Sequence, residues 1–457
     1  MMIIETRNPA TEQIIKTYDL FNETQLIESI DKTYAAYQAW KKKSYAERKA
    51  LMLKLAKLLD QKKTVYAKLI AEEMGKPVTA GHVEIEKCVW VCQHYAKHAE
   101  HYLKAESIQT DLQKSYVCYQ PLGIVFGIMP WNFPFWQVFR YAVPTIMAGN
   151  ATLLKHAPIS TGAALAMEAL FLEAGFPKHL FTTVLIDEDM AKFVIAHPHI
   201  AAVTLTGSER AGSSVAATAG QYLKRIVLEL GGNDPYLVLA DADLTYAAKC
   251  LVTSRLNNAG QSCIAAKRFI VIESVVDEFV EQVKLQMNRY NLGDPLNPKT
   301  TMGPIARADL REKLHQQVLA TQQQGAQILV GGTIPHQTGY YYPPTLITQV
   351  KPGMTAFEDE LFGPVISIIP VQNEHEAILL ANQSQFGLGG GVFTQDLQRG
   401  EHIARFDIET GTCFVNQFVS SDPRLPFGGI KKSGFGRELS RQGILEFVNV
   451  KTIGIGC

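Results

Sequence analysis

The sequence carries no net charge, because 44 lysines and arginines balance 44 aspartates and glutamates. That balance excludes a chain that is drawn as a whole to nucleic acid or to anionic lipid. The sequence also lacks an apolar run of membrane-spanning length, and residues 1–8 lack the basic start and apolar stretch of a secretory signal. We therefore expect a cytoplasmic protein with neither a nucleic-acid nor a membrane partner.

Cysteine is scarce, and its seven positions are scattered along 457 residues. An odd, dispersed set in so long a chain argues against a disulfide framework. A histidine-rich stretch at 82–101 also contains Cys88 and Cys92, which suggests a metal site. On a helix, however, these two cysteines share one face, whereas the histidines at 94–101 fall on nearly the opposite one. We expect packing and solvent exposure there, and no metal.

The length of the chain suggests two or three domains, and its composition of 47% hydrophobic residues suits a globular enzyme with a buried core. Ser44 and Glu47 have capping-box spacing before a leucine-rich stretch, which predicts a helix that begins near Ser44. Further along, short apolar stretches alternate with helix-length segments. Strands are expected at 116–120, 123–130, 151–155, 181–186, 201–206 and 225–230, and helices at 160–174, 189–197 and 209–219.

This alternation of strands and helices predicts an α/β protein. Its first sheet should be parallel and doubly wound, with a nucleotide-type crevice at the carboxyl ends of the strands. The same alternation repeats over 234–370, which predicts a second α/β domain.

Cys263 is a candidate nucleophile. It ends the small-residue stretch Asn258-Ala-Gly-Gln-Ser-Cys263, and a planar carbonyl can approach a sulfur that has no bulky neighbour. A buried core cysteine would show the same pattern, so the loop alone leaves both interpretations open.

Two further polar residues stand at the ends of apolar strands. Burial of Glu229 would raise its pKa toward the range of a general base, although a strand-end glutamate in a salt bridge is the alternative. Asn132 lies between Pro130 and Pro134, and its side-chain amide could donate a hydrogen bond to an oxyanion. The alternative is that this segment is only a rigid turn.

The segment Thr206-Gly-Ser-Glu-Arg-Ala-Gly212 follows a strand and could bind a phosphate through its backbone N–H groups. It does not match the G-x-G-x-x-G fingerprint, however, and an ordinary turn would look similar.

Taken together, these elements resemble the aldehyde dehydrogenase superfamily, whose motifs occur in order along essentially the whole chain. The matching segments are Asn8-Pro-Ala-Thr11, Pro130-Trp-Asn-Phe-Pro134, Thr206-Gly-Ser208, Leu228-Glu-Leu-Gly-Gly232, Gly260-Gln-Ser-Cys263, Glu360-Leu-Phe-Gly-Pro364 and Pro426-Phe-Gly-Gly429. The resemblance implies a Rossmann-type NAD(P)-binding domain of residues 1–103 and 121–232 and an α/β catalytic domain of residues 233–430. It also implies a small β oligomerisation element of residues 104–120 and 431–457, through which family members form dimers or tetramers.

The resemblance further implies roles for individual residues. Cys263 would be the nucleophile, Glu229 the base that activates the deacylating water, and Asn132 with the Cys263 backbone N–H the oxyanion hole. Thiolate attack would give a hemithioacetal that passes hydride to NAD(P), and water would then open the thioester. The cofactor-binding positions would be Trp131, Asn132, Lys155, His156, Ala157, Pro158, Gly207, Ser208, Leu230, Glu360 and Phe362.

Within the superfamily, the likeness is greatest to bacterial NAD(P)-linked succinate-semialdehyde dehydrogenases, which implies oxidation of succinate semialdehyde to succinate. Arg140 matches a residue that binds the distal carboxylate, and Ser421 a further substrate contact. NAD-preferring members carry a glutamate where this chain has Pro158, so we expect NADP to be accepted and NAD also used. Related enzymes have a second carboxylate-binding arginine where this chain has Asn257. Arg255 and Arg424 are two candidate substitutes for that arginine.

Several other functions stay open at this point. One is a dehydrogenase for glutarate semialdehyde or a neutral short aldehyde. Another is a thiol hydrolase or acyltransferase that uses Cys263 without redox chemistry, which would have no need of Glu360 or Phe362. A third is a non-catalytic protein on the same fold, which would be free to lose Cys263, Glu229 and Asn132. Formation of NAD(P)H separates the redox enzyme from the others.

Overall fold

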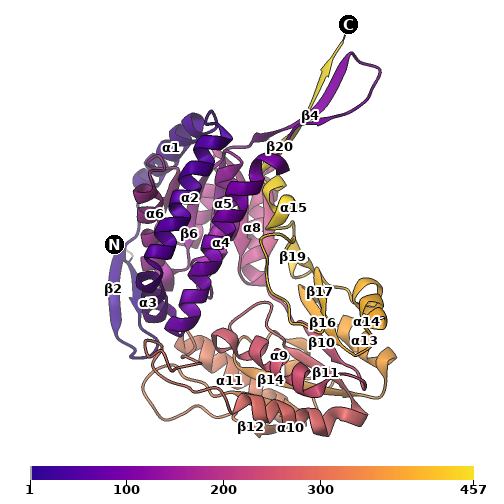
Figure 1. Cartoon of the computed structure of the whole chain (residues 1–457). Helices are drawn as coiled ribbons and strands as arrows, with labels where there is room; N and C mark the ends of the chain where they lie inside the picture. Colours follow the sequence, from indigo (N-terminus) through magenta and orange to yellow (C-terminus); the bar gives the residue numbers. More distant parts are fainter. Residues whose placement is uncertain (1–2, 457) are drawn as a thin grey trace.

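The computed structural model describes residues 3–456, so Met1, Met2 and Cys457, at the outer limits of the expected domains, lie outside the described residues. The chain forms two α/β bodies and an arm that projects from the first of them (Figure 1). Each body has its own large cluster of buried apolar side chains. The α/β class predicted from the alternating pattern is therefore confirmed.

The first body is built on a six-stranded sheet. In spatial order its strands are β19 (Gly434–Phe435), β9 (Arg225–Glu229), β8 (Ile200–Thr206), β5 (Ile124–Met129), β6 (Ala151–His156) and β7 (Phe181–Thr183). The five strands from β5 to β9 are parallel and lie in the doubly wound order 3-2-1-4-5, counted along the chain. In such a sheet the crevice opens at the carboxyl ends of the strands, where the order reverses between β5 and β8. The predicted strands are present, although β7 is shorter than the 181–186 expected.

The helices of the first body are long, and several begin at a side-chain cap. They are α1 (Glu23–Trp40), α2 (Tyr45–Gln61), α3 (Lys63–Met74), α4 (Val78–Tyr102), α5 (Trp136–Met147), α6 (Thr161–Ala174), α7 (Glu188–Ala196) and α8 (Glu209–Gln221). The capping box predicted at Ser44 is present, since Ser44 N donates to Glu47 Oε2 at 2.8 Å and Glu47 N donates to Ser44 Oγ.

Helix α4 carries the histidine-rich stretch, for which packing and solvent exposure are expected. Cys88 and Cys92 are fully buried on the expected face. His94 is also buried, because its ring packs 4.7 Å from the His98 ring and its Nε2 lies 3.1 Å from the Tyr102 hydroxyl. On the histidine face, His94 is therefore packed and His101 is exposed. Over residues 3–456, no cluster of three or more His, Cys, Asp or Glu side chains is arranged to hold a metal.

The second body contains a seven-stranded sheet, parallel except at β12. Its strands in spatial order are β12 (Gln327–Val330), β13 (Thr345–Thr348), β14 (Val365–Val371), β11 (Arg268–Ile272), β10 (Pro235–Val238), β16 (Gly389–Phe393) and β17 (Thr412–Val415). Its helices are α9 (Leu244–Leu256), α10 (Val276–Met287), α11 (Ala308–Gln323), α12 (Thr355–Glu358), α13 (Glu374–Asn382) and α14 (Leu397–His402). Strand β10 follows directly on the Gly231-Gly232 segment, so the two sheets are joined by a short connection after Glu229.

The arm is a three-stranded antiparallel sheet of β3 (Glu106–Ser107), β4 (Lys114–Pro121) and β20 (Val448–Ile455). Figure 1 shows β4 and β20 extending away from both bodies. The segment expected to belong to this element, 431–457, divides in two. Its earlier part returns to the first body, where β19 pairs with β9 and α15 (Ser440–Leu445) packs on α4 and α5, and only its later part enters the arm. Among residues 3–456, none of the helices combines the length and apolarity needed to cross a membrane.

Candidate active site

Two cavities meet at Cys263. The larger, of about 410 Å³, lies at the carboxyl ends of the strands of the first sheet and against the second body. The smaller, of about 240 Å³, lies between α4, α5 and the loops around residues 257–264 and 418–427. Cys263 and Gln137 line both cavities. A sulfur at this junction can be reached from one side by a cofactor and from the other by a substrate.

The loop before Cys263 adopts an unusual backbone conformation. Asn258 and Ala259 lie in the left-handed region with φ of 53° and 52°, a conformation that costs free energy for residues with a side chain. Gly260 follows with φ of 72°, and a Cβ there would lie 2.1 Å from the Gly363 carbonyl oxygen. These residues reverse the chain after α9, so that Cys263 reaches the junction of the cavities.

Lys267 holds this loop in place, and the sequence pattern did not identify it. Its buried ammonium donates to the carbonyl oxygens of Cys263 at 2.6 Å and Ser262 at 3.1 Å. It also forms an ion pair with Glu360 at 3.2 Å, and Glu360 Oε1 accepts from the Gly232 N–H. Lys267 therefore links a carboxylate expected to bind the cofactor to the backbone of the candidate nucleophile.

The thiol of Cys263 is protonated near neutral pH in this environment. Burial raises its pKa to about 12, the positive charges of Arg140 and Lys267 oppose this rise, and Glu360 and Glu229 add to it. A thiol with so high a pKa is a weak nucleophile. Attack on a carbonyl therefore requires a base or the approach of further positive charge.

Glu229 occupies the buried carboxyl end of β9, where the sequence placed it. Burial raises the pKa of its carboxyl group well above the usual value, and the neighbouring Glu438 raises it further. Neither carboxyl oxygen has a hydrogen-bond partner in the described part of the chain. Glu229 is close enough to Cys263 to affect its pKa, yet it lines neither cavity and forms no hydrogen bond with the sulfur. The structure thus places the candidate base behind the nucleophile, out of direct contact with it.

Asn132 links the end of β5 to the cysteine loop. Its Nδ2 donates to the Gln261 carbonyl at 3.0 Å, and Asn258 Nδ2 donates to the Asn132 carbonyl at 2.8 Å. An amide NH₂ has two N–H donors, so one remains for an oxyanion beside Cys263. Asn258 and Gln261, which sequence reasoning treated only as loop residues, emerge here as the groups that position the amide.

The larger cavity contains most of the residues expected to bind a cofactor. Those that line it are Trp131, Asn132, Gly207, Ser208, Leu230, Glu360 and Phe362. Ser208 caps α8 by accepting from the Ala211 N–H at 3.3 Å, so the amino end of α8, with its partial positive charge, lies at this cavity. The rings of Trp131 and Phe362 meet edge to face, with centroids 5.9 Å apart, across the two bodies. This donor set and shape suit a phosphate-bearing dinucleotide.

The remaining four expected cofactor positions, 155–158, lie at the end of β6 and outside this cavity. The imidazole of His156 is buried between the Pro134 carbonyl and the Ala157 N–H, and burial lowers its pKa to about 4. The ring is therefore neutral, and both of its nitrogens already have hydrogen-bond partners within the protein. Burial lowers the pKa of Lys155, and Asp187 and Glu188 partly offset that effect. Pro158 begins a short 3₁₀ turn and brings no carboxylate to this edge.

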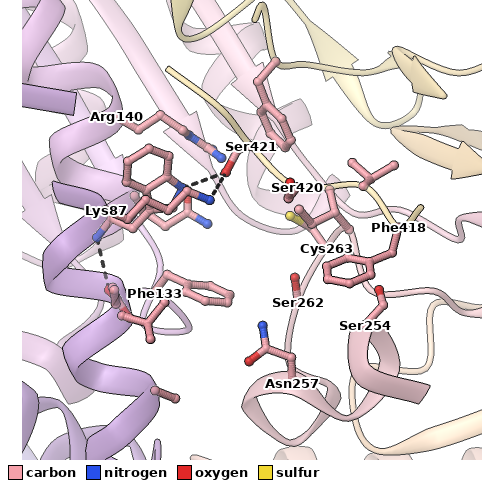
Figure 2. Close-up of a pocket in the computed structure, with 18 of the residues that line it drawn as sticks. Lys87, Phe133, Arg140, Ser254, Asn257, Ser262, Cys263, Phe418, Ser420 and Ser421 are labelled. Atoms are coloured by element: carbon pink, nitrogen blue, oxygen red, sulfur yellow. Dashed lines mark hydrogen bonds between the residues drawn. The ribbon is translucent and has the colours of Figure 1, made fainter. Parts of the chain in front are cut away.

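The smaller cavity brings together both expected substrate residues. Arg140, on α5, forms a buried ion pair with Glu438, and its guanidinium lies 4.6 Å over the Phe427 ring. The Ser421 hydroxyl accepts from Trp136 Nε1 at 3.1 Å and from Lys87 Nζ at 2.8 Å. Figure 2 shows Arg140, Lys87 and Ser421 on one wall and Asn257 with Ser254 on another. Lys87 was not identified from the sequence, where it is one of many helical lysines.

Neither Arg255 nor Arg424, the candidate substitutes for an arginine at Asn257, lines this cavity. Arg255 is fully buried, and its guanidinium donates to the carbonyl oxygens of Val365 and Leu361. Arg424 is exposed and bound to Asp422. Asn257 itself lines the cavity, but its amide carries no charge.

Comparison with known proteins gives a consistent result. The model of the aldehyde dehydrogenase family matches residues 2–453. A probable succinate-semialdehyde dehydrogenase (NADP+) from Synechocystis sp. is 46% identical over 454 residues, which cover 99% of this chain and 100% of the relative. The succinate semialdehyde dehydrogenase (NAD(P)+) Sad of Escherichia coli is 42% identical, with 98% and 96% covered.

Among solved structures, a succinic semialdehyde dehydrogenase from Streptococcus pyogenes in complex with NADP+ has the same fold. It superposes with a TM-score of 0.97 at 37% sequence identity, covering 99% of this chain and 100% of that one. The likeness therefore extends over both bodies and the arm.

Proposed function

Since the chain belongs to the aldehyde dehydrogenase family, we propose that it oxidises succinate semialdehyde to succinate with NADP+, through a thioester on Cys263. The relatives named for this reaction support the substrate and the coenzyme. The observation that carries the proposal is the position of Cys263 at the junction of two cavities. One has the phosphate-binding end of α8, and the other is lined by cationic side chains.

The first half of the reaction forms the thioester. The thiol of Cys263 loses its proton to solvent water, since Glu229 does not contact the sulfur, and the sulfur attacks the aldehyde carbon. The free N–H of Asn132 and the Cys263 backbone N–H donate to the oxygen, which becomes an oxyanion. NADP+, when bound in the larger cavity, supplies the acceptor for the hydride lost from the aldehyde carbon. Collapse of the oxyanion with loss of that hydride leaves a carbonyl bonded to sulfur.

The second half releases the acid. Glu229 removes a proton from a water molecule, and the resulting hydroxide attacks the thioester carbon. The C–S bond breaks, the thiolate of Cys263 leaves, and the product is a carboxylate. A carboxyl group whose pKa is raised by burial is suited to this role, because it takes up a proton more readily near neutral pH.

The residues that would hold the coenzyme follow from the larger cavity. Gly207 and Ser208 offer the amino end of α8 to its phosphates, while Glu360 and Phe362 would hold the ribose and nicotinamide. The first body would thus be the coenzyme domain and the second the catalytic domain. Lys155 and the backbone of 156–158 would contact the adenosine end. A proline at 158 removes a carboxylate that would repel a 2′-phosphate, so NADP+ is accepted and NAD+ also serves.

We further propose that the arm joins a second copy of this chain, since β20 is an edge strand with one side unpaired. Because the reaction needs a free thiol, which a reducing compartment preserves, we also propose a cytoplasmic location.

The proposal is tested with a panel of aldehydes and both coenzymes, following absorbance of the reduced coenzyme at about 340 nm. Succinate semialdehyde should give the highest kcat/KM, ahead of glutarate semialdehyde and butanal. Cys263→Ala should abolish reduced-coenzyme formation with every aldehyde. Hydrolysis of an ester or thioester, with no coenzyme reduction on any aldehyde, would instead identify a thiol hydrolase.

A further inference from the structure

The smaller cavity is lined by four ionisable side chains that the mechanism above does not use, namely Lys76, Glu84, Lys87 and Arg140. Lys87 lies on α4, one helical turn after Glu84 and on the same face. Its ammonium reaches across the Trp136 indole, 4.5 Å from the ring centre, and donates to Ser421 Oγ at 2.8 Å. It therefore lies beside one of the two residues expected to bind the substrate.

The charges around this cavity leave Lys87 uncompensated. Lys76 and Glu84 form a buried ion pair with each other. The Glu84 carboxylate also accepts from two backbone N–H groups at the start of α5. Arg140 is paired with Glu438. Within residues 3–456, Lys87 forms no ion pair of its own, so it supplies the net positive charge of the cavity.

The hydrogen bonds at Ser421 leave donors free on the same wall. Its hydroxyl oxygen already accepts two hydrogen bonds, from Trp136 and Lys87, so its own O–H is left to donate. An ammonium has three N–H donors, of which Lys87 uses one on Ser421. Donors from these two side chains suit the two oxygens of a carboxylate.

We propose that Lys87, with the Ser421 hydroxyl, binds the distal carboxylate of the aldehyde substrate and replaces the arginine that is absent at Asn257. This assignment rests on the proposed function. The cation approaches from α4, on the opposite side of the cavity from the cysteine loop, while Asn257 stays neutral. Arg140 contributes to the same positive field, but its pairing with Glu438 leaves Lys87 as the charge that a substrate must neutralise.

The protonation of Lys87 agrees with this role. Burial lowers the pKa of Lys87 to about 8, and the positive charge of Arg140 on α5 lowers it as well. Three groups raise it, namely Asp422 on the facing loop and Glu84 and Cys88 on the same helix. The ammonium is charged at pH 7 and loses its proton above about pH 8. The KM for an anionic aldehyde should therefore rise as pH increases through this range.

The test compares two substrates with the same carbon chain, succinate semialdehyde and its neutral methyl ester. Lys87→Met removes the charge and keeps an unbranched side chain. Lys87→Arg keeps the charge, and Lys97→Met, an exposed lysine on the same helix, is the matched control. Loss of a charge-assisted hydrogen bond should lower kcat/KM for the acid about tenfold to a hundredfold more than for the ester, mainly through KM. Lys87→Arg should restore most of the loss.

Measurements on the wild-type enzyme test the proposed substrate separately from the proposed role of Lys87. If it does not prefer the acid to the ester, the proposed substrate is wrong. If it prefers the acid and Lys87→Met keeps that preference, the role of Lys87 alone is overturned. An equal loss on both substrates has the same meaning, since it indicates a structural effect. Lys87→Gln provides a second neutral variant should the methionine variant unfold.

Discussion

At the residue scale, burial has opposite consequences for the two central side chains of this site. It holds the Cys263 thiol in its protonated, unreactive form, and it makes the Glu229 carboxylate a stronger base. The bound coenzyme would bring positive charge to the thiol and so favour the thiolate, which is the reactive species.

Glu229→Gln should separate the two halves of the reaction. Hydrolysis of the thioester should slow by about a hundredfold to ten-thousandfold, the usual contribution of a general base. Because Gln keeps the shape of the side chain, rapid mixing should show any reduced coenzyme that forms before this slow step. An unchanged steady-state rate would show that another group activates the water.

The raised pKa of Glu229 also predicts the pH profile of the wild-type enzyme. A raised pKa means that Glu229 is protonated, and inactive as a base, to a higher pH than an ordinary glutamate. The kcat should therefore fall as pH decreases through a value well above 4.5. A profile that stays flat down to pH 4.5 would contradict the assignment.

A further prediction at the residue scale concerns the choice of coenzyme. Pro158→Glu restores a carboxylate at the position where a 2′-phosphate is expected, and repulsion should raise the KM for NADP+ about tenfold relative to that for NAD+. Pro158→Gln, which adds the same length without charge, is the control. Equal effects of both variants would mean that backbone geometry, and not charge, is responsible.

At the scale of elements, α6 depends on a side chain from another helix. Glu73, on α3, accepts hydrogen bonds from the Gly162 and Ala163 N–H groups at 2.7 and 3.0 Å, and so satisfies donors in the first turn of α6. Burial raises the pKa of Glu73 to about 7, despite these bonds. The carboxyl group is therefore protonated in the folded state over a range where it is ionised in the unfolded chain.

This shift gives a stability that depends on pH. Between about pH 4.5 and 7 the native state holds a proton that the unfolded state has lost, so the contribution of Glu73 to stability decreases as pH rises through that window. Glu73→Gln cannot ionise and should gain up to about 3 kcal/mol relative to wild type between pH 4.5 and 8. Urea unfolding at pH 4.5 and at pH 8 measures the free energy of unfolding of both proteins. A Glu100→Gln variant, changed at an exposed glutamate, is the control. A difference that does not change with pH would contradict the shift.

At the scale of the whole molecule, the arm exposes apolar side chains that the single chain does not bury. Val450 and Ile455, on β20, are 54% and 43% exposed, although both are apolar. Changing both to lysine should destabilise pairing with a second copy and reduce the mass measured by light scattering. Leu397→Lys, which is 64% exposed in the second body, is the control. An unchanged mass would place the interface elsewhere.

The sequence by itself determined the local features of this protein. Ser44 begins its helix through contacts within four residues, and the strands ending at Met129, Thr206 and Glu229 follow from apolar runs. Such features depend on propensity and pattern, which are local properties. The resemblance of ordered motifs supplied the family and the identity of the candidate nucleophile.

Only the tertiary structure decided what surrounds those residues. Lys87 and Ser421 are 334 positions apart in the chain, and they meet because α4 and the 418–427 loop both pack at Trp136, at the start of α5. Lys267 donates a hydrogen bond to the backbone of Cys263. Arg255 donates to the carbonyl oxygens of Val365 and Leu361, more than 100 positions away in the chain. Whether a charged side chain is free or paired depends on its neighbours in space, and no spacing along a single sequence encodes that.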